Sequence, residues 1–463
     1  MIRVLSELVP PSVLALLVSE AIFVFSSFLL ACFVVLDIDP WVFLRYDRGL
    51  IRIAVVELSI LLGLYFHDLY ARIRVRSRIL LLQQVCQSIG IAFLVQALVS
   101  YLKPAWVVPR WVMVVGSGFA LVAIIGWRIL YTNVVLRALG GIRVLFLGRN
   151  ELVEAISRRV KERPELGIEI IGTLEEDEGG APAQAAEPIL GSVKAVKGTV
   201  ERTRPDRIVI GMREKRRALP VSDLLDLRLS GVLIDDAAKM YENIFGRVSV
   251  SNLLPGQLIF SSDLGPRPGR VAIQTLYSSA VGLIAVVVTA PLLLLIALAI
   301  KVSSRGPVLY RQKRVGLNGE TFVLYKFRSM YDDAEARTGA VWASKDDPRV
   351  TPLGRWLRRL RLDELPQLLN VLRGEMSIVG PRPERPEFVK TLVERIPYYR
   401  QRHCVKPGIT GWAQINHRYS DTLEDTVEKL EYDLYYIKNL SPALDAYIIF
   451  HTLKTMLLLR GAH

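Results

Sequence analysis

LYSSAVGLIAVVVTAPLLLLIALAI, from Leu276 to Ile300, is an apolar segment long enough to cross a lipid bilayer, whose ~30 Å hydrocarbon core needs ~20 residues of helix. Pro291 lies in its middle, where a proline removes a backbone hydrogen bond and bends a helix. Basic residues follow the segment at once: Lys301, Arg305, Arg311, Lys313 and Arg314. Two placements fit these features: a helix that spans the bilayer, or one that enters, bends at Pro291 and returns to the same face.

Four more apolar segments precede it, near Val9–Val35, Leu50–Phe66, Ile79–Tyr101 and Trp111–Val134. The first lacks the basic region and cleavage site of a signal peptide, and further spans follow it. The loop after the second carries Arg72, Arg74, Arg76 and Arg78, and basic loops stay in the cytoplasm. The sequence therefore predicts a four-helix transmembrane bundle at residues 1–140 with both ends inside.

This orientation decides between the two placements of the fifth segment. A spanning helix would carry the basic region after Lys301 outside, so we predict a re-entrant helix broken at Pro291. Glu20 and Glu57 lie inside the first two spans. Such costly intramembrane acids mark either a function or a contact between helices.

Composition also indicates a membrane protein. With 51% hydrophobic residues, a mean hydropathy of +0.31 and a net charge of +14, the chain suits an anionic lipid surface. The three cysteines show no disulfide framework or zinc-ligand spacing, which favours a cytoplasmic working end. We expect no nucleic-acid partner.

Between Gly141 and Asp236, short apolar runs alternate with amphipathic stretches. IRVLFLG, IEIIGTL, DRIVIGM and GVLID predict buried strands, and LVEAISRRV and SDLLDLRL predict helices. The alternation favours a doubly wound α/β domain at residues 141–260. Only Gly148 remains of the G-x-G-x-x-G dinucleotide fingerprint, so we expect a degenerate Rossmann-like domain with a structural or regulatory role. A linker is expected at residues 261–275.

The region from residue 276 to 463 holds the candidate chemistry, in a mixed α+β domain. VLYRQKRVGLNGETFVLYKFRSM predicts a hairpin turning at Asn318-Gly319. Lys326 and Arg328 are two apart in its second strand and so leave the same face. They predict an anion site or, equally well on spacing, a solvated strand end.

A basic amphipathic helix and an acidic pair follow. LGRWLRRLRL places apolar residues at helical spacing, which indicates a helix lying on a membrane or packed on a soluble core. Pro366 then starts a second helix directly after Asp363 and Glu364. At a helix N-terminus beside arginines, these acids are either ordinary caps or an ionised nucleophile near a phosphate site. Downstream, Gly380–Pro383 would hold Arg382 in a stiff loop suited to a bidentate phosphate contact.

KFRSM, LDELPQLLNVLRGEMSIVGPRP and KPGITGWAQIN resemble the bacterial sugar transferase family, the monotopic phosphoglycosyl transferases also called polyprenyl-phosphate hexose-1-phosphate transferases. The resemblance covers about Gln274 to the C-terminus, and the whole chain resembles the family's large form. It implies transfer of a hexose-1-phosphate from a UDP-sugar to undecaprenyl phosphate with release of UMP. That reaction is the first membrane step of exopolysaccharide or O-antigen synthesis. A homodimer is also implied, as is a location in the bacterial inner membrane with the catalytic domain on the cytoplasmic face.

The resemblance assigns roles to particular residues. Asp363 is implied as the nucleophile, forming a covalent phospho-sugar intermediate, with Glu364 as its partner and Mg²⁺ near Asp363. The expected substrate-binding residues are Lys326, Arg328, Arg361, Arg382, Asp433 and Asp445. Spacing alone would leave Asp433 and Asp445 as surface or capping residues. The chain departs from the family pattern with Ala290 before Pro291, which removes a serine hydroxyl, and with His417 in INHRYS.

Two functions from other classes remain open. A membrane-anchored nucleotide-sugar dehydratase would share the N-terminal half, but it needs an intact glycine fingerprint and a Tyr-x-x-x-Lys pair, and we find neither. A non-enzymatic membrane scaffold or regulator fits if the α/β domain is the active part. An assay for UMP release from UDP-sugars separates that scaffold from an enzyme.

Overall fold

The computed structural model describes residues 11–37, 39–70, 77–135, 141–163, 166–175, 187–212, 219–253, 268–331, 349–417 and 422–458. It divides into two compact units, residues 2–240 and 241–463, which are described separately. The basic loop of Arg72, Arg74 and Arg76 and residues 261–267 of the expected linker lie outside the described residues.

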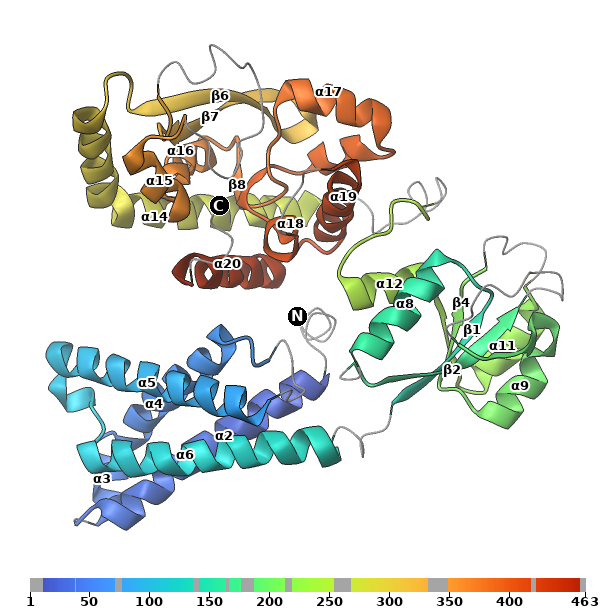
Figure 1. Ribbon diagram of the computed structural model, residues 1–463, viewed down its shortest axis with the longest axis horizontal. Coiled ribbons are helices and arrows are strands. Elements are labelled where there is room, and N and C mark those ends of the chain that lie inside the picture. The colour runs from blue at the N-terminus through green and yellow to red at the C-terminus, as the bar shows by residue number, and fades with distance from the viewer. Residues whose placement is uncertain are drawn as a thin grey trace. The chain divides into compact units, whose positions relative to one another are not determined.

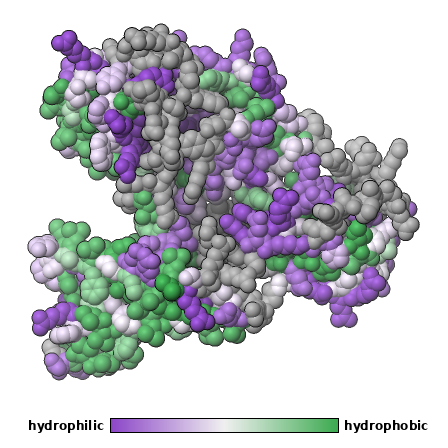
Figure 2. All heavy atoms as spheres, viewed as in Figure 1, coloured by the Kyte–Doolittle hydropathy of each residue, from purple (hydrophilic) through white to green (hydrophobic). Residues whose placement is uncertain are grey.

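Four long apolar helices open the first unit, as predicted: α2 (Pro11–Val35), α4 (Gly49–Phe66), α5 (Arg78–Leu102) and α6 (Arg110–Leu130). Their connections hold helix α3 (Pro40–Tyr46) and the 3₁₀ turn η1 (Pro104–Trp106), and α6 continues into a π-helical turn, η2 (Tyr131–Val135). Each long helix is apolar and long enough to cross a membrane. Apolar side chains also cover their outer surface (Figure 2), as expected where the surroundings are lipid.

A buried ion pair joins the bundle internally. Arg128 in α6 places Nε 2.6 Å from Oε1 of Glu20 in α2, and both side chains are fully buried. Arg128 also donates to the carbonyl of Leu69, and the Tyr70 hydroxyl donates to Glu20 Oε2 at 2.7 Å. In the structure, therefore, Glu20 makes a contact between helices.

The first unit ends in a five-stranded parallel sheet of order β3-β2-β1-β4-β5. Its strands are β1 (Ile142–Leu147), β2 (Ile168–Glu175), β3 (Ile189–Ser192), β4 (Arg207–Ile210) and β5 (Leu233–Asp236). Helices α8 (Glu151–Glu162), α9 (Val196–Thr203), α11 (Val221–Leu229) and α12 (Ala237–Phe245) connect or follow them. Figure 1 shows α8 on one face of the sheet and α9 and α11 on the other. The predicted α/β domain is confirmed, with β3 and α9 as additions.

The second unit begins within α12 and contains two pairs of strands and a set of helices. A hairpin joins β6 (Leu309–Val315) to β7 (Thr321–Phe327) through the turn η5 (Leu317–Gly319), as predicted. Strands β8 (Ser377–Val379) and β9 (Gly408–Thr410) are parallel. The helices are α14 (Pro268–Ser303), α15 (Pro352–Arg359), η6 (Leu362–Glu364), α16 (Gln367–Leu372), α17 (Pro386–Arg395), η7 (Tyr399–Cys404), α18 (Trp412–Asn416), α19 (Leu423–Lys438) and α20 (Pro442–Leu457).

Helix α14 carries Pro291 inside it and changes direction along its length (Figure 1). It begins at Pro268, so residues 268–275, which the sequence analysis gave to the linker, form its first two turns instead. Ser278 near its start bonds Ser377 of β8, whereas Ile296 and Ile300 near its end pack on Phe327 and Leu357. Both ends of α14 therefore rest on the same domain, while its middle exposes large apolar side chains such as Val288.

The segment after α12 belongs to the second unit by its contacts. Trp412 Nε1 donates to the carbonyl of Gly246 at 2.7 Å, and Val250 N–H donates to Glu431 Oε1 at 2.9 Å. Lys438 lies 2.7 Å from Glu242. Packing thus divides the chain between Met240 and Tyr241, about 20 residues before the boundary expected from composition.

Candidate active site

The acidic pair lies on η6, a single 3₁₀ turn between α15 and α16. Arg361 reverses the chain just before it, with φ 54° and ψ 22°. This left-handed conformation costs a non-glycine residue ~1–2 kcal/mol. Asp363 is buried and Glu364 is nearly so, so the strained turn presents both carboxylates to the interior of the domain.

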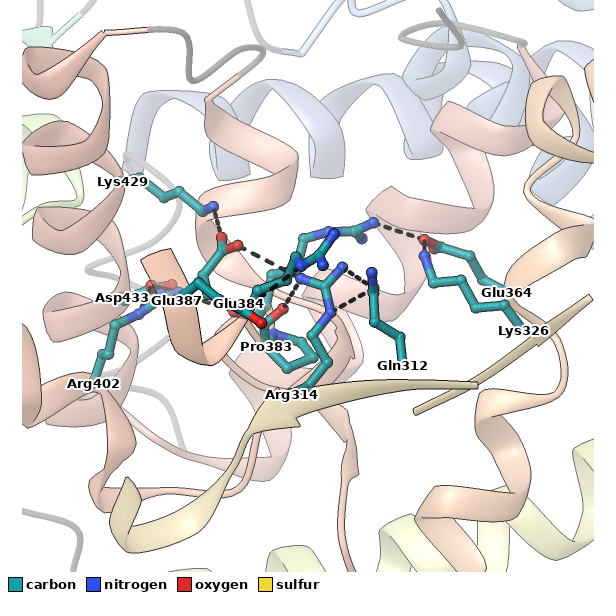
Figure 3. Close-up of polar contacts among 12 residues, drawn as sticks. Gln312, Arg314, Lys326, Glu364, Pro383, Glu384, Glu387, Arg402, Lys429 and Asp433 are labelled. Atoms are coloured by element: carbon teal, nitrogen blue, oxygen red, sulfur yellow. Dashed lines mark hydrogen bonds and ion pairs between the residues drawn. The ribbon is translucent and has the colours of Figure 1, made fainter. Parts of the chain in front are cut away.

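Two cations converge on Glu364. Lys326 Nζ lies 2.9 Å from Glu364 Oε1 (Figure 3). Arg382 Nη2 lies 2.7 Å from the same oxygen. Burial alone would raise the pKa of Glu364, but Arg382 and Lys326 outweigh it and hold that pKa well below its usual range. Glu364 is therefore a fixed anion that orders two cations of the site.

Asp363 differs from Glu364 both in its contacts and in the direction of its pKa shift. Its carboxylate forms no hydrogen bond or ion pair within the described residues. Burial, followed by the neighbouring charge of Glu364, raises the pKa of Asp363 to about 6, while Lys326, Arg358 and Arg382 oppose the rise. The pKa values of these two adjacent acids are thus shifted in opposite directions. Such a difference is common in active sites where one carboxylate reacts and the other holds neighbouring groups in place.

Arg328 bonds to Ser304 and not to the acidic dyad of Asp363 and Glu364. It follows the end of β7, is buried, and donates from Nη2 to the carbonyl and hydroxyl of Ser304 at 2.9 and 2.7 Å. Its Nη1 has no hydrogen-bond partner among the described residues. Ser329, the residue after Arg328, accepts a hydrogen bond at its hydroxyl from Arg358. Of the two strand cations expected to act together, only Lys326 reaches Glu364.

Asp433 and Asp445 occupy separate buried networks. Asp433 Oδ2 accepts from Arg402 at 2.8 Å, and both residues are almost fully buried. Asp445 accepts from Gln274 at 2.9 Å, from Tyr436 at 2.8 Å and from Tyr277. These bonds join α20 and α19 to the first part of α14. Spacing alone had left both aspartates as surface or capping residues, and the structure shows that neither is on the surface.

The sequence analysis missed a second set of charged residues behind Arg382. They are Arg314, Glu384, Arg402 and Lys429; Figure 3 shows Arg314 and Glu384 between the Lys326–Glu364 pair and Asp433, with Arg402 beside Asp433. Lys429 Nζ lies 2.5 Å from Glu384, whose pKa is lowered to about 2 because Lys429, Arg402 and Arg314 outweigh burial. Each partner is distant in sequence, so no local motif marks the cluster.

A metal ion bound at this site would need water or a substrate to complete its coordination shell. Within the described ranges, no three His, Cys, Asp or Glu side chains group closely enough to hold a metal. Mg²⁺ often takes one or two protein carboxylates and completes its shell with water and substrate phosphates. The uncommitted carboxylate of Asp363 fits that mode.

The chain is similar to known families and proteins. The family model "Bacterial sugar transferase" matches residues 269–459, and "CoA-binding domain" matches residues 65–225. One similar protein is the UDP-N-acetylgalactosamine-undecaprenyl-phosphate N-acetylgalactosaminephosphotransferase of Aeromonas hydrophila, 45% identical over 48% of this chain and 51% of that protein. Another is the undecaprenyl-phosphate glucose phosphotransferase of Komagataeibacter xylinus, 36% identical over 73% and 63%.

The chain thus spans about half of the first relative and less than two thirds of the second. It covers more of the UDP-glucose:undecaprenyl-phosphate glucose-1-phosphate transferase of Klebsiella pneumoniae, at 34% identity over 74% of this chain and 73% of that protein. Together with the match that covers nearly the whole second unit, this similarity confirms the expectation drawn from the three motifs: the chain belongs to the bacterial sugar transferase family.

Proposed function

We propose that this protein transfers a hexose-1-phosphate from a UDP-sugar to undecaprenyl phosphate through a covalent intermediate on Asp363. The observation that carries the proposal is the difference between the two carboxylates of the dyad. Glu364 is bound by Lys326 and Arg382, whereas the adjacent Asp363 carboxylate is uncommitted. A nucleophile needs such a free, ionisable carboxylate beside cations that can receive phosphates.

The first step forms a bond between a carboxylate oxygen of Asp363 and the β-phosphorus of the donor. The bond from that phosphorus to the bridging oxygen breaks, and UMP leaves with the bridging oxygen. Lys326 and Arg382 face the phosphates and offset their negative charge, because cations placed where charge develops lower the barrier. Mg²⁺, held by Asp363 and the phosphates, would add further charge neutralisation.

In the second step, a phosphate oxygen of undecaprenyl phosphate attacks the phosphorus of the acyl phosphate. The bond from phosphorus to the Asp363 oxygen breaks, which restores the carboxylate and yields the lipid diphosphate sugar. No net proton is needed when both carboxylate and lipid phosphate enter ionised. The two half-reactions predict ping-pong kinetics.

The site's surroundings suit a lipid acceptor. Helix α15 is short and strongly amphipathic, and Trp356 on it is 63% exposed with Arg359 over its ring. Exposed Trp beside arginine is typical of a helix at the surface of an anionic membrane. Helix α14 supports a re-entrant placement, since both its ends rest on one domain while Leu294 and Val288 in its middle are exposed.

The test is a transferase assay with the purified protein in lipid discs. The names of the relatives mention glucose and N-acetylgalactosamine, so the donors are UDP-glucose, UDP-N-acetylgalactosamine and their epimers, with undecaprenyl phosphate as acceptor. We expect UMP release with at least one donor. Without acceptor, mass spectrometry should find a sugar-phosphate adduct on the peptide that contains Asp363.

Two variants complete the test. Asp363→Asn keeps the shape and removes the attacking charge, so UMP and adduct should both disappear. Glu364→Gln should lower the rate severely, because Lys326 and Arg382 lose the anion that orders them. Formation of UMP only when acceptor is present, with no adduct, would indicate direct transfer in a ternary complex; absence of UMP with every donor would contradict the proposal and favour a scaffold.

A further inference from the structure

In the loop from Gly380 to Glu384, the Gly380 N–H donates to the carbonyl of Thr410, and the four carbonyl oxygens that follow, from Pro381 to Glu384, each accept a hydrogen bond. Pro381 and Pro383 have no N–H to donate, so their carbonyls are the backbone groups left for anchoring the loop. The backbone N–H of Gly408 donates to Pro381 at 3.0 Å, and that of Val315 donates to Glu384 at 2.9 Å. The two carbonyls between them, of Arg382 and Pro383, accept from guanidinium groups.

Those guanidinium groups belong to Arg402 and Arg314. Arg402 Nη2 lies 3.0 Å from the carbonyl oxygen of Arg382, and Arg314 Nη1 lies 3.0 Å from that of Pro383. Hydrogen bonds from charged donors are about twice as strong as neutral ones. The backbone that carries the Arg382 side chain is therefore fixed by two charged donors from other parts of the domain.

The Arg402 side chain is held in place by burial and by several hydrogen bonds. It is 3% exposed, and it donates from Nε and Nη2 to Asp433 Oδ2 at 3.1 and 2.8 Å. Its Nη1 donates to the Tyr399 hydroxyl at 2.7 Å, and its guanidinium lies over the Tyr399 ring. Asp433 and Tyr399 thus lock Arg402, and the bond to Arg382 is its contact with the loop of the site.

We infer that Arg402 is a positioning residue for the donor: through the carbonyl of Arg382 it aims the Arg382 guanidinium at Glu364, and Asp433 acts by holding Arg402. The inference rests on the proposed function, in which Arg382 faces the donor phosphates. It replaces the substrate contact expected for Asp433 with an indirect role, since Asp433 is buried against Arg402.

The test is a double-mutant cycle on kcat/KM for the UDP-sugar. Arg402→Ala in the native background should lower kcat/KM ~100-fold, the scale of a misplacement of ~1 Å at a catalytic group. In an Arg382→Ala background the same change should cost no more than ~2-fold, because residues that act as a unit are not additive. Asp433→Asn should follow the same pattern. Equal losses in both backgrounds would show a general structural role and overturn the inference.

A second readout needs no substrate. Hydrogen–deuterium exchange of the peptide containing Gly380–Glu384 should rise in Arg402→Ala. Arg400→Ala, an exposed arginine on the same turn, is the matched control and should leave exchange and rate unchanged. If the wild type releases no UMP, the proposed function fails while this exchange experiment still decides the inference, and unchanged exchange in Arg402→Ala overturns it.

Arg402→Ala leaves Asp433 buried without a counter-ion, a change that can unfold a protein. Arg402→Lys is the second variant because it keeps the charge but loses the planar fork that bonds Asp433 and Arg382 together. We expect it to fold, with a smaller loss of kcat/KM and raised exchange in the loop. A folded Arg402→Lys protein equal to the wild type in both measurements would overturn the inference.

Discussion

The side-chain amide of Asn370 pairs with the open edge of strand β7 at Tyr325, whose N–H donates to Asn370 Oδ1 at 3.1 Å. Asn370 Nδ2 donates to the carbonyl of Val323 at 2.7 Å and to Glu375 Oε2 at 2.7 Å. Fully buried in α16, Asn370 thus takes the place of a neighbouring strand. Lys326 follows Tyr325 directly, so this clamp fixes the strand that carries one of the two cations on Glu364.

Replacing Asn370 by Ala should destabilise the domain and weaken donor binding. The change leaves the Tyr325 N–H and the Val323 carbonyl without their buried partner, at ~1–3 kcal/mol for each unsatisfied group. Thermal unfolding and KM for the UDP-sugar measure the two effects. Glu375→Gln keeps an acceptor for Nδ2 and serves as the control. An unchanged unfolding temperature in Asn370→Ala would show that the strand edge does not depend on the amide.

The rate should depend on the ionisation of Asp363. Because burial and then the charge of Glu364 raise its pKa to about 6, the nucleophile is protonated below that pH. We expect kcat/KM for the donor to fall ~tenfold per pH unit below about 6. Lys326→Met removes a cation that lowers this pKa, so the acid limb should move to higher pH. A limb centred near pH 4 would indicate an ordinary, solvated carboxylate.

The same ionisation should reduce stability. An acid whose folded pKa is raised favours the protonated folded state, so its penalty is absent below the unfolded value of about 3.8 and complete above about 6. Asp363→Asn removes the penalty and should raise the unfolding temperature by a few degrees at pH 7.5. The gain should vanish as the pH falls from 6 towards 4. A gain that is equal at both pH values would rule out Asp363 ionisation as its cause.

The second unit should depend on the segment before the expected linker. A truncated protein that begins at Ala237 keeps the contacts of Gly246, Glu242 and Val250 with α18 and α19, whereas one that begins at Ser261 loses them all. We expect the longer form to be active and clearly more stable in thermal unfolding. Equal unfolding temperatures would show that the segment contributes nothing to the second unit.

Both ends of α14 should face the same side of the membrane. With the native cysteines replaced, single cysteines at Gly269 and Ser303 should react with an impermeant reagent from the cytoplasmic side only. Pro291→Leu restores a backbone hydrogen bond inside α14, so it should straighten the helix and lower activity without altering Asp363 and Glu364. Labelling of Gly269 and Ser303 from opposite sides would establish a spanning helix.

Local patterns predicted the elements well. The long helices follow from uninterrupted apolar runs, and the β6–β7 hairpin follows from Asn318-Gly319, where both residues adopt positive φ. Strand β3 is four residues long and exposed on alternate positions, so its apolar signal is weak. Residues 241–253 are too short and mixed in composition to reveal that they pack on α19.

The candidate site was predictable only in part. Asp363, Glu364, Lys326 and Arg382 stand out because they lie in recognisable motifs. Arg402 and Arg314 carry no such signal: Arg402 meets Asp433 31 residues away, and Arg314 meets Pro383 69 residues away. A buried arginine cannot be told from an exposed one by its neighbours in sequence, so the residues that aim Arg382 emerge only from the fold.

The pair of Glu20 and Arg128 has a consequence for biogenesis. The two residues are separated by 108 positions, and they sit on the first and last helices of the bundle. During synthesis the first helix therefore enters the bilayer with a carboxyl group whose partner has not yet been translated. Since an unpaired charge in hydrocarbon is costly, we expect the first helix to settle fully in the bilayer only when α6 arrives and Arg128 pairs with Glu20.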